Sequence, residues 1–246
     1  MTNKYLYFIA NWKMYGDLKT LNSLDKVIKF LNTIKLKKIK LIYCPPSTLI
    51  RPLSKRLKKT NIEVGAQNCH ESKKFASLTG QINASMLKDV GAKYVILGHS
   101  ENRQNGEHNE LINQKIKTAL KSGLKVIFCI GETLKEKNKN QTYRILNHQI
   151  NNCLKGIKNF SKIIIAYEPV WAIGTGKIPK LEDLKKNIFF VKKKFKNKSI
   201  KVLYGGSVNT KNIKDLKKIS TINGFLIGGD SRDPKKFIDI IKKTYN

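Results

Sequence analysis

The sequence has few of the features that mark membrane, secreted or disordered proteins. Its apolar runs fall well short of the roughly 18 residues that a spanning helix needs, so we expect no membrane partner. A hydrophobic content of 40% excludes intrinsic disorder. The short apolar stretch near the N-terminus has no small-residue cleavage site, which favours a cytoplasmic protein. Cys44, Cys69, Cys129 and Cys153 show no C-x-x-C spacing, so we expect reduced thiols.

Arginine and alanine are scarce: the 246 residues include 5 Arg and 8 Ala, against 44 Lys. A formal net charge of +32 is typical of proteins that bind nucleic acids. Reading of bases and bidentate phosphate contacts favour Arg, however, and the lysines are spread along the whole chain. Lys, Asn and Ile, whose codons are rich in A and T, supply 97 residues. We interpret the charge as compositional drift and expect no nucleic-acid partner.

Short apolar runs recur about every 30 residues and predict eight strands. Runs such as VIFCI and IIIAY are almost continuously hydrophobic, which is typical of parallel strands covered on both faces. The predicted strands are 5–10, 39–44, 62–67, 94–98, 124–130, 162–167, 201–204 and 224–227.

Lys-rich stretches with apolar residues at helical spacing lie between these strands. Two clear apolar stripes are Leu21, Leu24, Ile28 and Leu31, and Leu184, Ile188, Val191 and Phe195. The residues that we expect to begin helices are Asp17, Ser47, Asn83, Asn209 and Asp233.

Eight strands that alternate with helices fit either an open doubly wound sheet or a closed barrel. A dinucleotide-binding sheet would carry G-x-G-x-x-G after its first strand, where this chain has NWKMYG. Polar or glycine-rich clusters instead follow nearly every strand, at the edge where a barrel builds its active site. The sequence therefore predicts an α/β fold, a single (β/α)8 TIM barrel that forms one domain over residues 1–246.

Glu168 follows the sixth predicted strand and is placed to act as a general base, although a structural ion pair is an alternative. The next residues, VWAIGTGK, combine apolar side chains with Gly174 and Gly176. Because apolar side chains are costly in an exposed loop, this segment predicts a lid that excludes water; an ordinary packed loop is the alternative.

His99, Asn11 and Lys13 follow two other predicted strands. His99 stands at the start of a helix, where the local dipole favours a neutral imidazole that can donate to a substrate oxygen. Asn11 and Lys13 alternate with Trp12, so both can face the barrel mouth, and Lys13 offers a positive charge to an anion. A structural histidine and one more solvated lysine are the alternatives.

Paired glycines follow the last two predicted strands, in GGS at 205–207 and at Gly228 and Gly229. Such pairs let backbone N–H groups approach an anion, and these loops are the usual phosphate site of barrels. Tight turns also use glycine, so each pair alone is weak evidence. The chain has no G-x-x-x-x-G-K-[ST] motif and no cluster with metal-ligand spacing, so we expect no metal and no cofactor.

The motifs together resemble those of the triosephosphate isomerases over essentially the whole chain. They are NWKM at 11–14, AQN at 66–68, LTGQI at 78–82, GHSEN at 98–102, CIGE at 129–132, AYEPVWAIGTGK at 166–177, YGGSV at 204–208 and GFLIGGDS at 224–231. The resemblance implies interconversion of dihydroxyacetone phosphate and D-glyceraldehyde 3-phosphate through an enediol(ate), a step of glycolysis and gluconeogenesis linked to the pentose phosphate pathway.

The resemblance also implies a role for each site residue. Glu168 would move the proton between carbons, neutral His99 would polarise the carbonyl, and Lys13 and Asn11 would stabilise the enediolate. Glu101 would orient Lys13. The remaining predicted residues bind phosphate or hold the lid: Gly174, Ser207, Gly228 and Gly229 for phosphate, Tyr204 and Ser207 to close the lid, and Glu132 and Trp171 across its hinge.

The family works as a homodimer, which implies an interface through the loop from His70 to Gly80 and the turn from Asn11 to Gly16. Thr79 would approach Asn11 of the partner subunit. The chain departs from the usual family pattern at seven positions. Four of them usually carry Glu, Arg, Arg and Asp and here have Gln, Asn, Lys and Asn, one has Tyr for Asn, and two have Asp or Arg for apolar residues. These positions are Tyr15, Gln81, Asn102, Lys192, Asn223, Asp230 and Arg232. Asp230 follows the phosphate glycines, so we expect it to weaken phosphate binding unless its side chain points away.

Two other interpretations remain. A different sugar-phosphate isomerase or aldolase could use the same barrel, but a Schiff-base aldolase would need a lysine within the sixth strand, which has Ile164, Ile165 and Ala166. A barrel that serves only as a binding protein for anionic surfaces would give no turnover and strongly salt-dependent binding.

Overall fold

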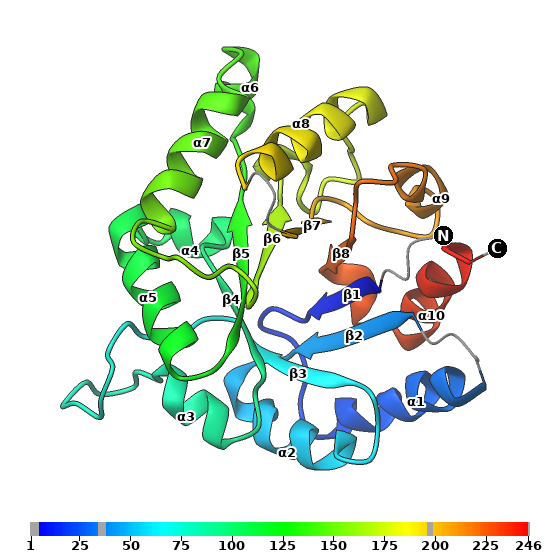
Figure 1. The fold of residues 1–246 in the computed structure, drawn as a ribbon. Coiled ribbons are helices and arrows are strands. Elements are labelled where there is room, and N and C mark those ends of the chain that lie inside the picture. The colour runs from blue at the N-terminus through cyan, green and yellow to red at the C-terminus, as the bar shows by residue number, and fades with distance from the viewer. Residues whose placement is uncertain (1–4, 34–37, 196–198, 246) are drawn as a thin grey trace.

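The computed structural model describes residues 5–33, 38–195 and 199–245 and confirms the predicted barrel. Within these residues, eight parallel strands pair in sequence order, and the last pairs with the first (Figure 1). The strands are β1 (Leu6–Asn11), β2 (Ile39–Cys44), β3 (Glu63–Ala66), β4 (Tyr94–Leu97), β5 (Lys125–Ile130), β6 (Ile163–Tyr167), β7 (Lys201–Tyr204) and β8 (Gly224–Ile227).

Helices surround the barrel and cover its outer face (Figure 1). They are α1 (Leu24–Thr33), α2 (Ser47–Leu57), α3 (Ala84–Asp89), α4 (Ser100–Gln104), α5 (Asn109–Lys121), α6 (Leu134–Asn138), α7 (Thr142–Cys153), α8 (Leu181–Lys193), α9 (Ile213–Lys217) and α10 (Pro234–Lys243). Short 3-10 turns lie at η1 (Lys19–Ser23), η2 (Val170–Ala172) and η3 (Gly229–Ser231). These elements run from Leu6 to Lys243; residues 1–4 and 246 of the predicted domain lie outside the described part of the chain.

The strand predictions are correct in number and order and differ from the structure by single residues at some ends. The predictions 39–44, 201–204 and 224–227 match β2, β7 and β8. The strand predicted over 94–98 ends at Leu97, because Gly98 has a positive φ of 73° and turns the chain out of the sheet.

The predicted helix starts are partly confirmed. Asn83 and Asp233 are the N-caps of α3 and α10, and each accepts a backbone N–H from the first turn. Ser47 is the first residue of α2 and so begins that helix as predicted, with Pro46 at the cap position. The prediction for Asn209 is wrong. Asn209 instead accepts N–H groups in a turn, and α9 begins four residues later.

The core has two layers because side chains alternate across each strand. One set fills the barrel interior; the other packs against the helices, including Leu184, Ile188 and Val191 of the predicted α8 stripe. The interior residues are Ile9, Ile42, Cys44, Tyr94, Ile96, Ile127, Cys129, Ile164, Ala166, Leu203 and Leu226. This packed barrel holds the C-terminal ends of all strands in fixed positions, and polar side chains gather there.

Candidate active site

A cavity of about 250 Å³ lies at the C-terminal ends of the strands. It collects predicted site residues from five strand ends that are distant in sequence. Its lining includes Asn11, Lys13, His99, Glu168, Gly174, Ser207, Gly228 and Gly229, together with Ile173, Gly176, Gly205, Gly206, Val208, Asn209, Leu226 and Asp230. All four residues predicted to be catalytic and all predicted phosphate ligands therefore meet in one place.

Glu168 is almost completely buried at the end of β6, with 3% of its surface exposed. Its Oε1 atom lies 3.6 Å from His99 Nε2, and its Oε2 atom has no hydrogen-bond partner within the described chain. Burial raises the pKa of this carboxyl, while His99 and Lys13 act in the opposite direction. A carboxylate with a free oxygen and a raised pKa is well suited to accept a proton from carbon.

Gly205 provides the space that Glu168 occupies, and sequence reasoning gave it no such role. A Cβ atom at this position would lie 2.6 Å from Glu168 Cγ and 2.9 Å from Oε1. Gly131 is needed in the same way, since a Cβ there would lie 1.8 Å from the Glu168 carbonyl oxygen. Gly131 and Gly205 are therefore both needed for the packing of Glu168.

His99 is the N-cap of α4 and is 5% exposed. Its Nδ1 atom accepts the backbone N–H of Glu101 at 3.3 Å. An acceptor role at Nδ1 leaves the ring proton of a neutral imidazole on Nε2, the nitrogen that faces Glu168 and the cavity. The ring can thus donate to a substrate oxygen, as the sequence predicted.

Lys13 is held from several directions. Its ammonium pairs with Glu101, as predicted, and its backbone N–H donates to Asn11 Oδ1 at 3.1 Å. The Lys13 backbone has a positive φ of 55°, which is uncommon outside glycine. Gln67 Nε2 donates 2.8 Å hydrogen bonds to the carbonyl oxygens of Lys13 and Cys44. Sequence reasoning missed Gln67: its place in AQN was a signal, but the reach of its amide across the barrel mouth was not visible.

The segment 169–177 lies over the cavity and is fastened by Ser207. Gly176 N–H donates to Ser207 Oγ at 3.0 Å, while Ser207 Oγ and N–H both donate to the carbonyl of Ala172, at 2.7 and 3.0 Å. Gly174 and Gly176 have positive φ, which explains why the segment needs glycine there. The lid therefore has one polar fastening point on the loop after β7.

Glu132 and Trp171 meet at the start of the lid, as predicted. Trp171 Nε1 donates to Glu132 Oε1 at 3.1 Å, and the Tyr167 hydroxyl donates to the same carboxylate. Burial raises the pKa of Glu132. The Lys137 ammonium lies 3.7 Å from the centre of the Trp171 ring. The hinge thus carries a buried carboxylate and a cation–π contact.

The predicted contact of Tyr204 with the lid is not seen. The Tyr204 hydroxyl is buried but has no hydrogen-bond partner within the described residues. It lies under Gly206, where an added Cβ would come within 2.3 Å of it. Its phenol ring packs in the core, so the hydroxyl reaches the base of the loop after β7, and Ser207 makes the hydrogen bonds to the lid.

Asp230 lines the cavity together with Gly228 and Gly229. Its Oδ1 atom lies 3.8 Å from Lys236 Nζ, which partly offsets its charge. Of the other family departures, Asn223 is buried, and its Oδ1 accepts the Val202 N–H at 3.0 Å. A neutral amide thus bridges the ends of β7 and β8 where the family usually has a carboxylate.

The part of the chain that the structure describes contains no group of three or more His, Cys, Asp or Glu residues that could hold a metal ion. Among the same residues, no helix is both long and apolar enough to cross a membrane. The cavity offers a carboxylate, an imidazole, an ammonium group and glycine-rich turns. The fold and this site define a (β/α)8-barrel enzyme built to move protons on a small anionic substrate.

Comparison with known proteins agrees with this class. The family model described as triosephosphate isomerase matches residues 6–244. Proteins named triosephosphate isomerase from Thermodesulfovibrio yellowstonii and Yarrowia lipolytica are 41% and 40% identical, over 96% of this chain and 98% and 97% of theirs. The crystal structure of triosephosphate isomerase from Bartonella henselae is 32% identical, covers 98% of this chain and 99% of its own, and has a TM-score of 0.89. The chain belongs to the triosephosphate isomerase family.

Proposed function

We propose that this chain interconverts dihydroxyacetone phosphate and D-glyceraldehyde 3-phosphate with Glu168 as the base that moves the proton. Family membership supports the reaction. The observation that carries the assignment of the base is the Glu168 carboxylate, buried in the cavity with one oxygen unpartnered and the other 3.6 Å from His99.

In the proposed cycle, Glu168 removes the proton from the carbon beside the carbonyl and returns it to the neighbouring carbon. His99 Nε2–H polarises the carbonyl oxygen and moves protons between the two oxygens. The Lys13 ammonium and the Asn11 amide stabilise the charge that develops on the enediolate. Glu101 keeps Lys13 in place through their ion pair.

The phosphate is assigned to Gly174, Ser207, Gly228 and Gly229, with the backbone N–H groups of the three glycines as donors. Three separate loops carry these residues, and all four line the cavity. With the lid fastened at Ser207, water is kept from the intermediate, which would otherwise eliminate phosphate. Glycine at these positions lets the backbone approach the phosphate oxygens closely.

A coupled isomerase assay on purified protein tests the proposal. Glu168→Asp should lower kcat strongly, because the carboxylate retreats by one methylene while phosphate affinity is kept. His99→Asn should also lower kcat, because the amide cannot shuttle protons as imidazole does. Parent activity at background would refute the function, and full activity of Glu168→Asp would refute the role of Glu168.

We propose further that the chain works as a homodimer through the loop from His70 to Gly80 and the turn from Asn11 to Gly16. Both carry large exposed apolar side chains: Met14 is 92% exposed and Phe75 is 82% exposed. In Figure 1 the loop between β3 and α3 extends away from the barrel. Apolar side chains presented in this way support burial against another chain.

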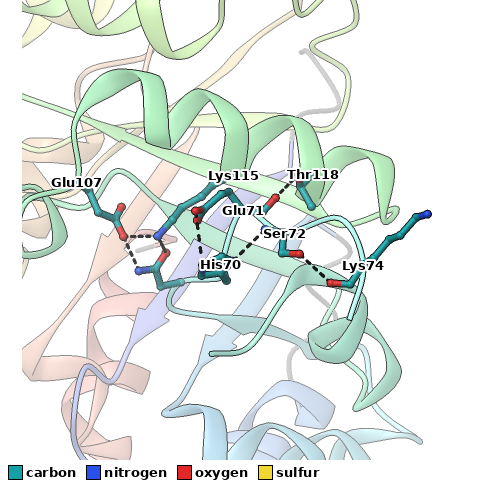
Figure 2. Close-up of polar contacts among 8 residues, drawn as sticks. His70, Glu71, Ser72, Lys74, Glu107, Lys115 and Thr118 are labelled. Carbon is teal, nitrogen blue, oxygen red and sulfur yellow. Dashed lines mark hydrogen bonds and ion pairs between the residues drawn. The ribbon is translucent and has the colours of Figure 1, made fainter. Parts of the chain in front are cut away.

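The base of this loop is anchored to the barrel and α5, as Figure 2 shows. His70 Nδ1 accepts the Ser72 N–H at 3.0 Å, and Thr118 Oγ1 of α5 donates to the Glu71 carbonyl at 2.9 Å. Lys115 pairs with Glu107 beneath it. An ordered base reduces the entropy lost when a loop docks, which favours a stable interface.

Phe75→Asp should therefore convert a dimer into a monomer, which light scattering would measure. Phe189→Asp is the matched control, because Phe189 is 59% exposed on α8. A parent protein that is monomeric at micromolar concentration would refute the dimer. Equal masses for parent and Phe75→Asp would remove Phe75 from the interface.

Location and domain organisation complete the proposal. We assign the reaction to the cytoplasm, where it serves glycolysis and gluconeogenesis and connects with the pentose phosphate pathway. All four cysteines are free and buried, which suits a reducing compartment. One domain over residues 1–246 stays a prediction.

A further inference from the structure

Two turns that carry proposed site residues lie next to each other, where the neighbouring strands β1 and β8 end. The turn from Asn11 to Gly16 follows β1 and carries Lys13, while η3 follows β8 and begins at the phosphate glycines. The strands are hydrogen-bonded neighbours. A Cβ atom added to Gly228 would lie 3.6 Å from Lys13 Cε, so the Lys13 side chain passes close to the turn that carries Gly228. Any relative movement of these turns would change both sites together.

An inner link joins the two turns. Trp12 Nε1 donates to the Ser231 carbonyl at 3.3 Å, within the buried part of the structure. Ser231 in turn donates from Oγ to the Gly228 carbonyl at 2.6 Å and from its N–H at 3.0 Å. These contacts fix the Gly228 end of η3.

An outer link joins them at the surface. The Arg232 guanidinium lies 3.8 Å from the centre of the Tyr15 ring, and its Nε donates to the Gly229 carbonyl at 3.2 Å. Within the single chain Arg232 and Tyr15 are both exposed, so these contacts rather than burial within the chain hold the pair. A planar guanidinium can stack on a ring while its edge donates a hydrogen bond, a combination that an ammonium group does not reproduce.

We propose that Arg232 and Tyr15 form a stacked pair that positions the phosphate turn against the turn that carries Lys13. Arg232 is a positioning residue: it holds the Gly229 peptide, and Tyr15 holds Arg232. The inference rests on the proposed function, because it assumes that Gly228 and Gly229 bind the substrate phosphate.

Steady-state kinetics and inhibition by inorganic phosphate test the pair. Arg232→Ala and Tyr15→Leu should each raise KM and the phosphate Ki by about two- to fivefold, with kcat little changed, since an exposed cation–π contact is worth about 0.5–1 kcal/mol. Tyr15→Phe keeps the ring and should match the parent. The double variant should have a KM and a phosphate Ki no higher than those of the more impaired single variant, because both substitutions remove the same contact.

Lys235→Ala is the charge control, since it removes one exposed positive charge at the start of α10. Light scattering on each variant checks that all the proteins compared have the same oligomeric state. A parental Ki for Tyr15→Leu, or equal effects of Arg232→Ala and Lys235→Ala, would show that Arg232 acts through charge alone and would overturn the proposal. Absence of turnover in the parent would instead overturn the proposed function.

Discussion

Replacing Gly205 by alanine should displace the catalytic carboxylate and slow turnover. The new Cβ would lie 2.6 Å from Glu168 Cγ, whereas ordinary contacts begin near 3.4 Å. All three atoms that the new Cβ would crowd belong to Glu168. The Glu168 side chain must therefore move by roughly 1 Å. A misplacement of about 1 Å costs about 100-fold in rate, or roughly 2.7 kcal/mol of transition-state stabilisation.

The expected result is a kcat about 100-fold below the parent value, with a KM that changes little because the phosphate ligands stay in place. The coupled assay measures both constants, and thermal unfolding reports on the fold. Gly106→Ala is the matched control: its Cβ meets nothing within 4 Å, but its φ of +97° makes it costly for stability. It should lower the melting temperature and leave kcat unchanged. A folded Gly205→Ala enzyme with kcat within about threefold of the parent would refute this reasoning.

Three further outcomes are expected. Asp230→Ala should lower KM and the phosphate Ki by about two- to fivefold at low salt, because it removes a carboxylate whose charge Lys236 only partly offsets. Equal Ki values for parent and variant would show that Asp230 does not weaken phosphate binding. Ser207→Ala should lower kcat/KM by about tenfold and raise phosphate release from the intermediate, because the lid loses its fastening; unchanged product ratios would contradict this. Because burial raises the pKa of Glu168 above 4.5, the folded state binds that proton more tightly than the unfolded state, so the parent should lose stability relative to Glu168→Gln as pH rises above 4.5. Urea unfolding at several pH values measures that difference, and a constant difference between pH 4 and 8 would be inconsistent with it.

Strand number and parallel pairing were predictable because parallel strands buried on both faces have a nearly continuous apolar pattern. The closed barrel was predicted from the polar and glycine-rich clusters that follow nearly every strand. Helix starts were less predictable. Asn83 and Asp233 cap helices and Ser47 begins one as expected, but Asn209 does not, because its side chain accepts N–H groups in a turn and α9 begins four residues later. A capping side chain competes with its neighbours, and the sequence does not rank them.

The residues that line the cavity could be named from the sequence, because they stand in contiguous motifs at strand ends; their roles stay predictions. The residues that hold these side chains in place were not predicted. Gln67 bonds the Lys13 carbonyl across the barrel mouth, and Gly205 makes room for Glu168. Both depend on contacts between segments that only folding brings together.

By itself, the amino-acid sequence determined the barrel, the position of the reacting groups along the chain and the family resemblance, since each is written in local pattern and motif. The tertiary structure alone decided which contacts those groups make. Among the described residues, it leaves one Glu168 oxygen without a hydrogen-bond partner. It also bonds the segment 169–177 to Ser207 and stacks Arg232 on Tyr15. The reason is physical: hydrogen bonds, burial and ring stacking depend on distances of a few tenths of an ångström between residues far apart in sequence, and no local pattern specifies them.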